Sequence, residues 1–156
     1  MGRGGVARVA RPAQDLGEPT AEPLLMRAFE TKTLAGEADA VAPDGTAVRL
    51  LLTLPSGSFA HFELPAGAVS RAVAHRTVEE IWWVLSGRGR IWRRSGETEH
   101  VVDAAPGLCL TIPLGTHFQF RAEPQAPFAF LAVTMPPWPG GDEAFPVAGP
   151  WRATVP

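Results

Sequence analysis

Short runs of apolar and β-branched residues, separated by turn-forming residues, begin near residue 26 and continue to residue 135. Runs of this length and composition are typical of β-strands. They predict strands at residues 26–32, 47–54, 58–64, 71–74, 80–86, 89–94, 98–102, 108–112, 117–121 and 128–135. Most of the segments between these strands contain Pro or Gly, which favour tight turns.

No stretch between the predicted strands is long and periodic enough to predict an amphipathic helix. We therefore expect an all-β chain that folds as an antiparallel β-barrel or jelly roll. Because the sequence shows no internal repeat, a single barrel is expected, at residues 24–135. Residues 1–23 lack periodicity and are interpreted as a flexible arm. Residues 136–156 are rich in Pro and predict an irregular tail, in which Trp138 or Trp151 packs over an apolar surface.

Some apolar side chains are predicted to lie outside the barrel. Successive side chains of a strand point to opposite faces, so Trp83 and Trp92 should face away from the interior. Exposed aromatic surface often marks an interface, and we therefore predict a homodimer. Cys109 lies within an apolar run and is predicted to be a packed thiol.

Composition and charge narrow the possible partners and compartment. The formal net charge of −2 argues against a nucleic-acid partner. The longest apolar runs are too short to span a bilayer, and residues 1–14 lack the apolar core of a secretory signal. With a single Cys, no intramolecular disulfide can form, and we expect a cytoplasmic protein. Lys32 is the sole Lys and Asn and Tyr are absent, a bias typical of GC-rich genomes that favours a bacterial source.

The segment 67–87 has the spacing of a known motif. Gly67, His75, Glu80 and Gly87 fall in register with the first motif of the cupins, and residues 81–87 resemble the strand and turn that end it. The chain thus resembles the cupin superfamily, of the single-domain RmlC-like type with a double-stranded β-helix. This resemblance implies a small barrel around one pocket.

A second segment matches the second cupin motif. Gly107, Pro113 and Gly115 occupy its fixed positions, and the resemblance covers residues 51–135. Cupins commonly form dimers through a sheet face, which agrees with the predicted homodimer. The fold hosts epimerases, isomerases, dioxygenases, decarboxylases and plain binding modules, so function has to be argued from the site.

In cupins, two His and a Glu of the first motif join a His of the second motif around a divalent metal. Here the first His position is Val73 and the last is Phe118, while His117 lies one residue early. A shift of one residue on a strand turns a side chain to the opposite face. Only His75 and Glu80 stay in register, so the metal motif is degenerate.

Three interpretations of this partial site remain open. In the first, the turn before His117 lets it join His75 and Glu80 around Fe, Mn, Ni, Zn or Cu, with His61 as a further donor. In the second, His75 and Glu80 form a hydrogen-bonded pair that lines a metal-free pocket. In the third, both residues are merely packed and satisfied. No cofactor is certain from the sequence.

These interpretations lead to three functional hypotheses. The first is a small-molecule-binding protein with an apolar pocket. The second is a metal-dependent dioxygenase or isomerase that uses His75, Glu80 and His117 as ligands. The third is a metal-free acid–base enzyme with His75 and Glu80 as the catalytic candidates. The residues predicted to contact the ligand are Val73, His75, Glu80, Trp82, Phe118 and Phe120.

Overall fold

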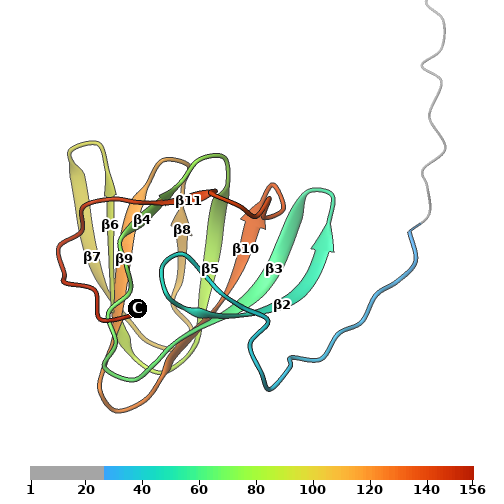
Figure 1. Cartoon of the computed structure of the whole chain (residues 1–156), viewed down its shortest axis with the longest axis horizontal. Coiled ribbons are helices and arrows are strands. Elements are labelled where there is room, and N and C mark those ends of the chain that lie inside the picture. The colour runs from blue at the N-terminus through green and yellow to red at the C-terminus, as the bar shows by residue number, and fades with distance from the viewer. Residues whose placement is uncertain (1–26) are drawn as a thin grey trace, which may run out of the picture.

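The structure, a computed structural model, describes residues 27–156, and within that range the regular elements are all strands (Figure 1). In chain order these are β1 (Ala40–Val41), β2 (Ala47–Leu54), β3 (Gly57–Leu64), β4 (Val73–His75), β5 (Glu79–Ser86), β6 (Gly89–Ser95), β7 (Thr98–Ala104), β8 (Cys109–Ile112), β9 (His117–Ala122), β10 (Phe128–Met135) and β11 (Ala144–Pro146). The predicted all-β fold is confirmed. Among residues 27–156 no helix could cross a membrane.

The strands form two antiparallel sheets that face each other across the interior (Figure 1). The first has six strands in the order β1-β2-β3-β10-β5-β8, and the second has five in the order β11-β4-β9-β6-β7. Strands adjacent in space are often far apart in the chain, as in the pairing of β3 with β10. This is the jelly-roll arrangement of an antiparallel barrel.

Aromatic side chains fill the interior between the sheets. Trp82, Phe120, Phe128 and Phe130 are buried, and the Trp82 ring stacks on Phe130 with centroids 4.1 Å apart. Burying an aromatic or large aliphatic side chain contributes about 1.5–3 kcal/mol each. The alternation predicted for β5 is also present, because Glu80, Trp82 and Val84 are buried while their neighbours are exposed.

Gly87, the last residue of the first motif, is required by its surroundings. Its φ of 74° lies in the left-handed region, which favours glycine. The backbone of Pro127 also occupies the place that a Cβ atom would need. The turn between β5 and β6 therefore requires glycine at this position.

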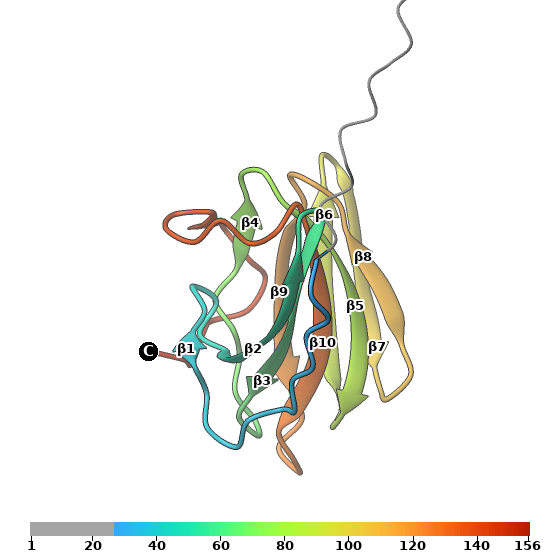
Figure 2. The ribbon, with the colours of Figure 1, turned by 90° about the vertical axis from the view of Figure 1, so that its right-hand side faces the viewer.

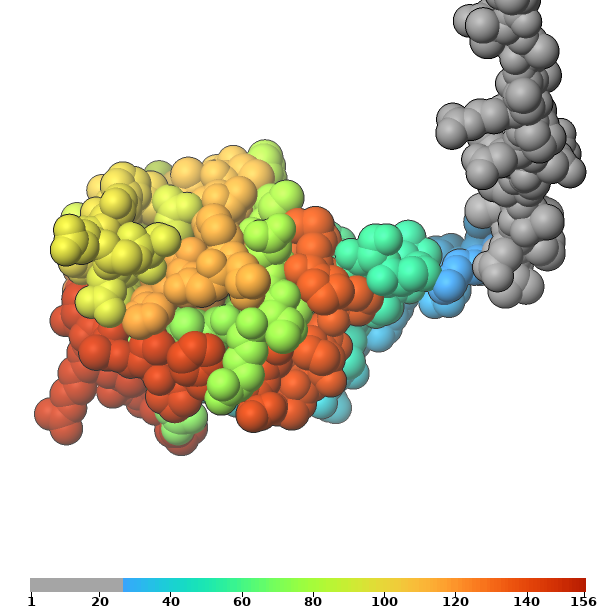
Figure 3. All heavy atoms as spheres, turned by 90° about the horizontal axis from the view of Figure 1, so that it is seen from above, coloured from blue at the N-terminus to red at the C-terminus, as the bar shows by residue number. Residues whose placement is uncertain are grey.

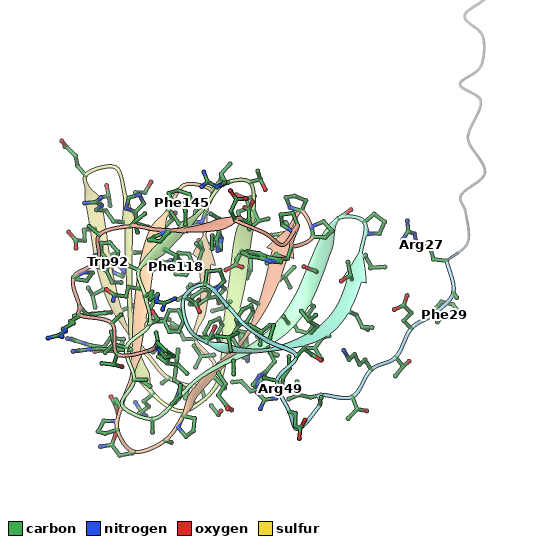
Figure 4. All side chains as sticks on the ribbon, viewed as in Figure 1. Arg27, Phe29, Arg49, Trp92, Phe118 and Phe145 are labelled. Carbon is green, nitrogen blue, oxygen red and sulfur yellow. The ribbon has the colours of Figure 1, made fainter. Side chains whose placement is uncertain are left out.

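The prediction of a strand at residues 26–32 is wrong for residues 27–32, which the structure describes. Residues 27–35 form an extended segment without sheet partners, and Phe29 is fully exposed (103%). Figure 4 shows Phe29 on this segment, away from the strands. Apolar residues predicted a strand here, but a strand also needs a partner, and nothing in residues 27–156 supplies one.

The C-terminal segment contains more structure than the sequence pattern predicted. Strand β11 pairs with β4, and the chain then follows the outside of the five-stranded sheet. There Gln119 accepts a hydrogen bond from the Trp151 amide at 3.0 Å and donates one to the Trp151 carbonyl at 2.8 Å. The flexible arm expected at residues 1–23 lies outside the described residues.

Candidate ligand-binding cavity

A cavity of about 400 Å³ lies inside the barrel, between the two sheets. Its wall is mainly apolar, and Figure 4 shows Phe118 within this interior. The apolar and aromatic lining residues include Val41, Val48, Leu50, Leu51, Phe59, Phe62, Val73, Trp82, Phe118, Phe130 and Trp138. A concave, mostly apolar cavity with few polar groups is the usual form of a small-molecule site.

Asp44, His75 and Glu80 are the ionisable residues of the cavity wall. Asp44 comes from the turn before β2, His75 ends β4, and Glu80 lies near the start of β5. All three side chains are buried. In the part of the chain that the structure describes, neither Lys nor Arg lines the cavity, so the ionisable groups of the wall are two carboxyls and one imidazole.

Glu80 is held by the indole of its neighbour on the same strand face. Its Oε2 accepts a hydrogen bond from Trp82 Nε1 at 2.6 Å. Burial and, to a smaller extent, the nearby Asp44 charge together raise the pKa of Glu80 to about 8. The hydrogen bond from Trp82 opposes this rise. At neutral pH Glu80 is therefore mainly a protonated, neutral carboxylic acid.

His75 lies between two aromatic rings. Its ring meets Phe118 edge to face at 5.2 Å and Trp138 at 5.3 Å, measured between centroids. Its Nδ1 is buried and has no hydrogen-bond partner among residues 27–156. Burial lowers the pKa of His75 to about 4, although the Glu143 charge opposes this shift. His75 is therefore a neutral imidazole at neutral pH.

Asp44 is a cavity residue that the sequence analysis did not identify. It lies in a tight turn, where its Oδ1 accepts hydrogen bonds from the Thr46 amide at 2.9 Å and the Thr46 hydroxyl at 2.6 Å. Burial raises the pKa of Asp44, and the hydrogen bonds from Thr46 oppose that effect. The segment 43–45 predicted only a turn, because the turn residues carry no sign of which side chain points into the barrel.

Trp138 covers part of the cavity from the C-terminal segment. Its backbone amide donates a hydrogen bond to Ser58 Oγ at 2.9 Å, and Ser58 is also hydrogen-bonded to Thr134. Seen from above, the C-terminal segment (red) and the loop between β4 and β5 (green) lie next to each other over the barrel (Figure 3). The predicted packing of Trp138 over an apolar surface thus takes place at the cavity.

Glu143 fastens this segment to the loop between β4 and β5. Its Oε1 accepts hydrogen bonds from the amides of Thr77 at 2.6 Å and Val78 at 2.8 Å, and its Oε2 accepts one from the Thr77 hydroxyl at 2.9 Å. Desolvation would raise the pKa of Glu143, but these hydrogen bonds and the nearby His75 outweigh it and lower the pKa. This role could not be predicted from the sequence, because it depends on contacts between distant segments.

The structure brings together most of the side chains that were predicted to contact a ligand. Val73, His75, Glu80, Trp82 and Phe118 all line the cavity. Phe120 does not line it, because its ring packs behind Trp82 and Phe130 in the core, 5.4 Å and 5.3 Å away between centroids.

The predicted metal set of His75, Glu80 and His117 is not assembled. Phe118 lines the cavity, so His117 beside it points to the other face, where its Nδ1 lies 3.2 Å from Arg94. His61 is also on the wrong face, because its neighbours on β3 line the cavity. Within residues 27–156 no group of three or more His, Cys, Asp or Glu side chains could hold a metal. The cupin metal does not fit the residues present.

Two further expectations about side-chain exposure are wrong. Trp92 faces away from the barrel interior as predicted, since it pairs with Gln119 on β9, but it is buried there and its indole is hydrogen-bonded to Glu99 of the adjacent strand. Cys109 is exposed, because it lies on the outer face of the edge strand β8. Trp83 does face solvent, as predicted.

Comparison with known proteins identifies the same fold. The family model described as "Cupin domain" matches residues 60–134. No curated protein sequence matches the chain significantly. Among solved structures, the Streptomyces nucleoside dehydratase Pac13 is similar with a TM-score of 0.59 and 15% identity, covering 76% of this chain and 92% of Pac13.

Two larger proteins contain a similar barrel. The capsular polysaccharide assembling protein CapF of Staphylococcus aureus has a TM-score of 0.58 and 15% identity over 68% of this chain, and the match spans 32% of CapF. The coconut allergen cocosin has a TM-score of 0.57 and 21% identity over 67% of this chain and 30% of its own. At these identities the similarities show the fold alone. Together with the family match, the two motifs and the jelly roll, they show that the chain contains a cupin domain.

Proposed function

We propose that this cupin is a small-molecule-binding protein, and that its ligand places an apolar body in the cavity and a polar group against His75 and Glu80. The observation that carries the proposal is the cavity of about 400 Å³, whose apolar wall holds Asp44, His75 and Glu80 as its ionisable groups. A related barrel, that of Pac13, has a solved structure with uridine, which supports small-molecule binding by this fold.

Burial favours the neutral forms of the polar groups, which suits a ligand site that works without a metal. A protonated Glu80 can donate and accept a hydrogen bond, and neutral His75 can do the same through its two ring nitrogens. Both groups would be desolvated by a bound ligand, and a hydrogen bond to the ligand offsets that cost. The aromatic rings of Trp82, Phe118 and Trp138 supply the apolar contact.

A fluorescence titration with 2-naphthol, a small aromatic alcohol, tests this proposal. Trp82 and Trp138 line the cavity, so we expect saturable quenching of tryptophan emission. Ala60→Leu adds side-chain volume inside the cavity and should weaken binding about tenfold or more, equivalent to about 1.4 kcal/mol. Trp83→Phe, on the outer face, is the matched control and should bind normally. Absence of saturable binding would contradict the proposal.

A second candidate function is favoured by the opposite protonation preferences of two cavity residues. The pKa of Glu80 is raised to about 8 and that of His75 is lowered to about 4, so Glu80 is an acid and His75 a base at neutral pH. Such a pair can move protons to and from a substrate. If it does so, the protein should accelerate deuterium exchange at the acidic carbon of 2-indanone in chelator, and His75→Gln should abolish the acceleration.

We also propose that the protein is a homodimer and that the outer face of the six-stranded sheet is its interface. Ile81, Trp83 and Leu85 of β5 are exposed on this face, at 43%, 47% and 44%. The extended segment at residues 27–38 passes in front of β3 and β10 in the view of Figure 2 but stands away from the strands, and Phe29 and Leu34 are exposed. A two-fold dimer buries the same patch of each chain, so a second copy would cover the exposed apolar residues of β5 in both chains.

A further inference from the structure

The charges around the cavity constrain the ligand beyond its size. Within residues 27–156, the wall contains two carboxyl groups, those of Asp44 and Glu80, and neither Lys nor Arg. The third ionisable group, His75, has a buried Nδ1 without an acceptor in this part of the chain, so a proton added there would lack a partner. Glu143, which acts on His75 from the C-terminal segment, adds another negative charge. The described wall therefore presents only negative or neutral groups to an anionic ligand.

The same groups would stabilise a positive charge. Asp44 and Glu80 are near enough for the charge of Asp44 to act on Glu80. Burial disfavours the charged form of such carboxyls, because an isolated buried charge is costly. A cation between them would remove that cost by pairing with the carboxylate. The aromatic rings of Trp82, Phe118 and Trp138 would add favourable cation–π contact.

We infer that the cavity selects ligands that carry a protonated amine on an apolar or aromatic body, and that Asp44 and Glu80 receive the ammonium group. This inference rests on the proposed small-molecule function and names its ligand class. When the ammonium binds, the carboxylic acid loses its proton to solvent and becomes the carboxylate partner. Binding of the amine near neutral pH should therefore release up to one proton per ligand.

Three ligands of nearly equal size separate charge from shape: 2-phenylethylamine, 2-phenylethanol and 3-phenylpropionate. We expect the amine to bind about tenfold more tightly than the alcohol, with the carboxylate weakest. Calorimetry in buffers of different ionisation enthalpy should show proton release with the amine and none with the alcohol. The affinity of the amine should rise between about pH 6 and about pH 8, while that of the alcohol stays constant.

Glu80→Gln and Asp44→Asn should each reduce the affinity for the amine far more than the affinity for 2-phenylethanol, and so remove most of the preference for the amine. A cooperative urea unfolding transition shows that each variant is folded. The exposed neighbour Glu79, changed to Gln, is the matched control and should keep the preference.

Equal binding of amine and alcohol, or amine binding without proton release, would overturn the inference. If 2-naphthol binds and none of the three ligands does, the inference fails while the proposed function stands. If 2-naphthol also fails to bind, the proposed function fails and the inference with it.

Discussion

Glu80 couples the ionisation of the cavity to the stability of the fold. The folded protein keeps Glu80 protonated up to about pH 8, whereas the unfolded chain ionises it near the ordinary pKa of 4.5. Between these values the unfolded state binds fewer protons than the folded state, so the free energy of unfolding falls as the pH rises. His75 acts in the opposite sense, since stability is lost as the pH falls from 6.5 towards its folded pKa of about 4.

Glu80→Gln removes the ionisable group but retains an oxygen that can accept the Trp82 hydrogen bond. We predict that the variant and the wild type have similar free energies of unfolding near pH 4. The variant should become the more stable of the two by a few kcal/mol near pH 8, since one pKa unit corresponds to about 1.4 kcal/mol. Urea denaturation across this pH range measures the difference. A constant difference at every pH would show that Glu80 is not protonated in the folded state.

Two apolar residues account for the loss of the cupin metal site. Val73 and Phe118 occupy the ligand positions of the two motifs, and they are cross-strand partners on β4 and β9. We predict that Val73→His combined with Phe118→His, beside His75 and Glu80, restores stoichiometric binding of Ni²⁺ or Zn²⁺. Isothermal calorimetry measures this binding, with the two single variants as controls. If the double variant folds and binds no metal, the cavity differs from a metal cupin in more than these ligands.

The sequence predicted five of the residues that line the cavity. Val73, His75 and Glu80 followed from the motif spacing, and Trp82 and Phe118 from strand alternation. The lining residues of β2, β3 and β10 were not predicted. Phe120 was misassigned because alternation gives the face of a residue but not its distance from the cavity. Asp44 was not predicted, because its inward direction depends on the turn packing against residue 71, whose amide donates a hydrogen bond to the Asp44 carbonyl.

Among the elements of the fold, the C-terminal segment is held to the loop between β4 and β5 by the buried carboxylate of Glu143. Glu143→Gln loses a charged acceptor for the hydrogen bonds from Thr77 and Val78. Hydrogen bonds to charged groups contribute about 1.5–3 kcal/mol, so we expect a loss of this order in the free energy of unfolding. Amide hydrogen exchange should become faster in residues 76–78 and 138–147, and the affinity for 2-naphthol should fall.

Asp142→Asn is the matched control for this prediction. Asp142 is adjacent to Glu143 and forms an exposed ion pair with Arg76, which contributes little. Its exchange pattern should match that of the wild type. If Glu143→Gln behaves like this control, Glu143 does not hold the segment over the cavity.

Most strands were predictable because each depends on local alternation and a nearby turn. Strands β1 and β11 were missed, since two or three residues carry no periodicity. Strand β1 forms by pairing with the neighbouring β2, and β11 by pairing with the distant β4. The strand expected at residues 26–32 was wrong for the opposite reason. Its apolar residues gave the local signal, yet the described part of the chain provides no strand to pair with.

At the scale of the whole molecule, the proposed dimer predicts that the outer sheet face controls the oligomeric state. Trp83→Glu places a charge in the centre of this face and should shift the protein from dimer to monomer in size-exclusion chromatography with light scattering. Val101→Glu, at an exposed apolar position on the other sheet, is the matched control and should leave the dimer intact. A wild-type monomer at micromolar concentration would rule out the dimer.

The rate at which the Cys109 thiol is labelled tests the same interface independently. It is exposed and lies beside Trp83 on the neighbouring strand. In a dimer through this face, a maleimide should label Cys109 slowly, and labelling should become faster in Trp83→Glu. Equal labelling rates would show that the interface lies elsewhere.

We propose that the cavity of this cupin binds its ligand without a metal. Elemental analysis of untagged protein, after each of Fe, Mn, Ni, Cu and Zn has been offered and the excess removed, measures whether a metal is held. We expect well below one equivalent of every metal in a sample that still binds 2-naphthol saturably. One equivalent of a metal that is lost in His75→Ala would contradict it, and would mean that the cavity assembles a metal site despite Val73 and Phe118.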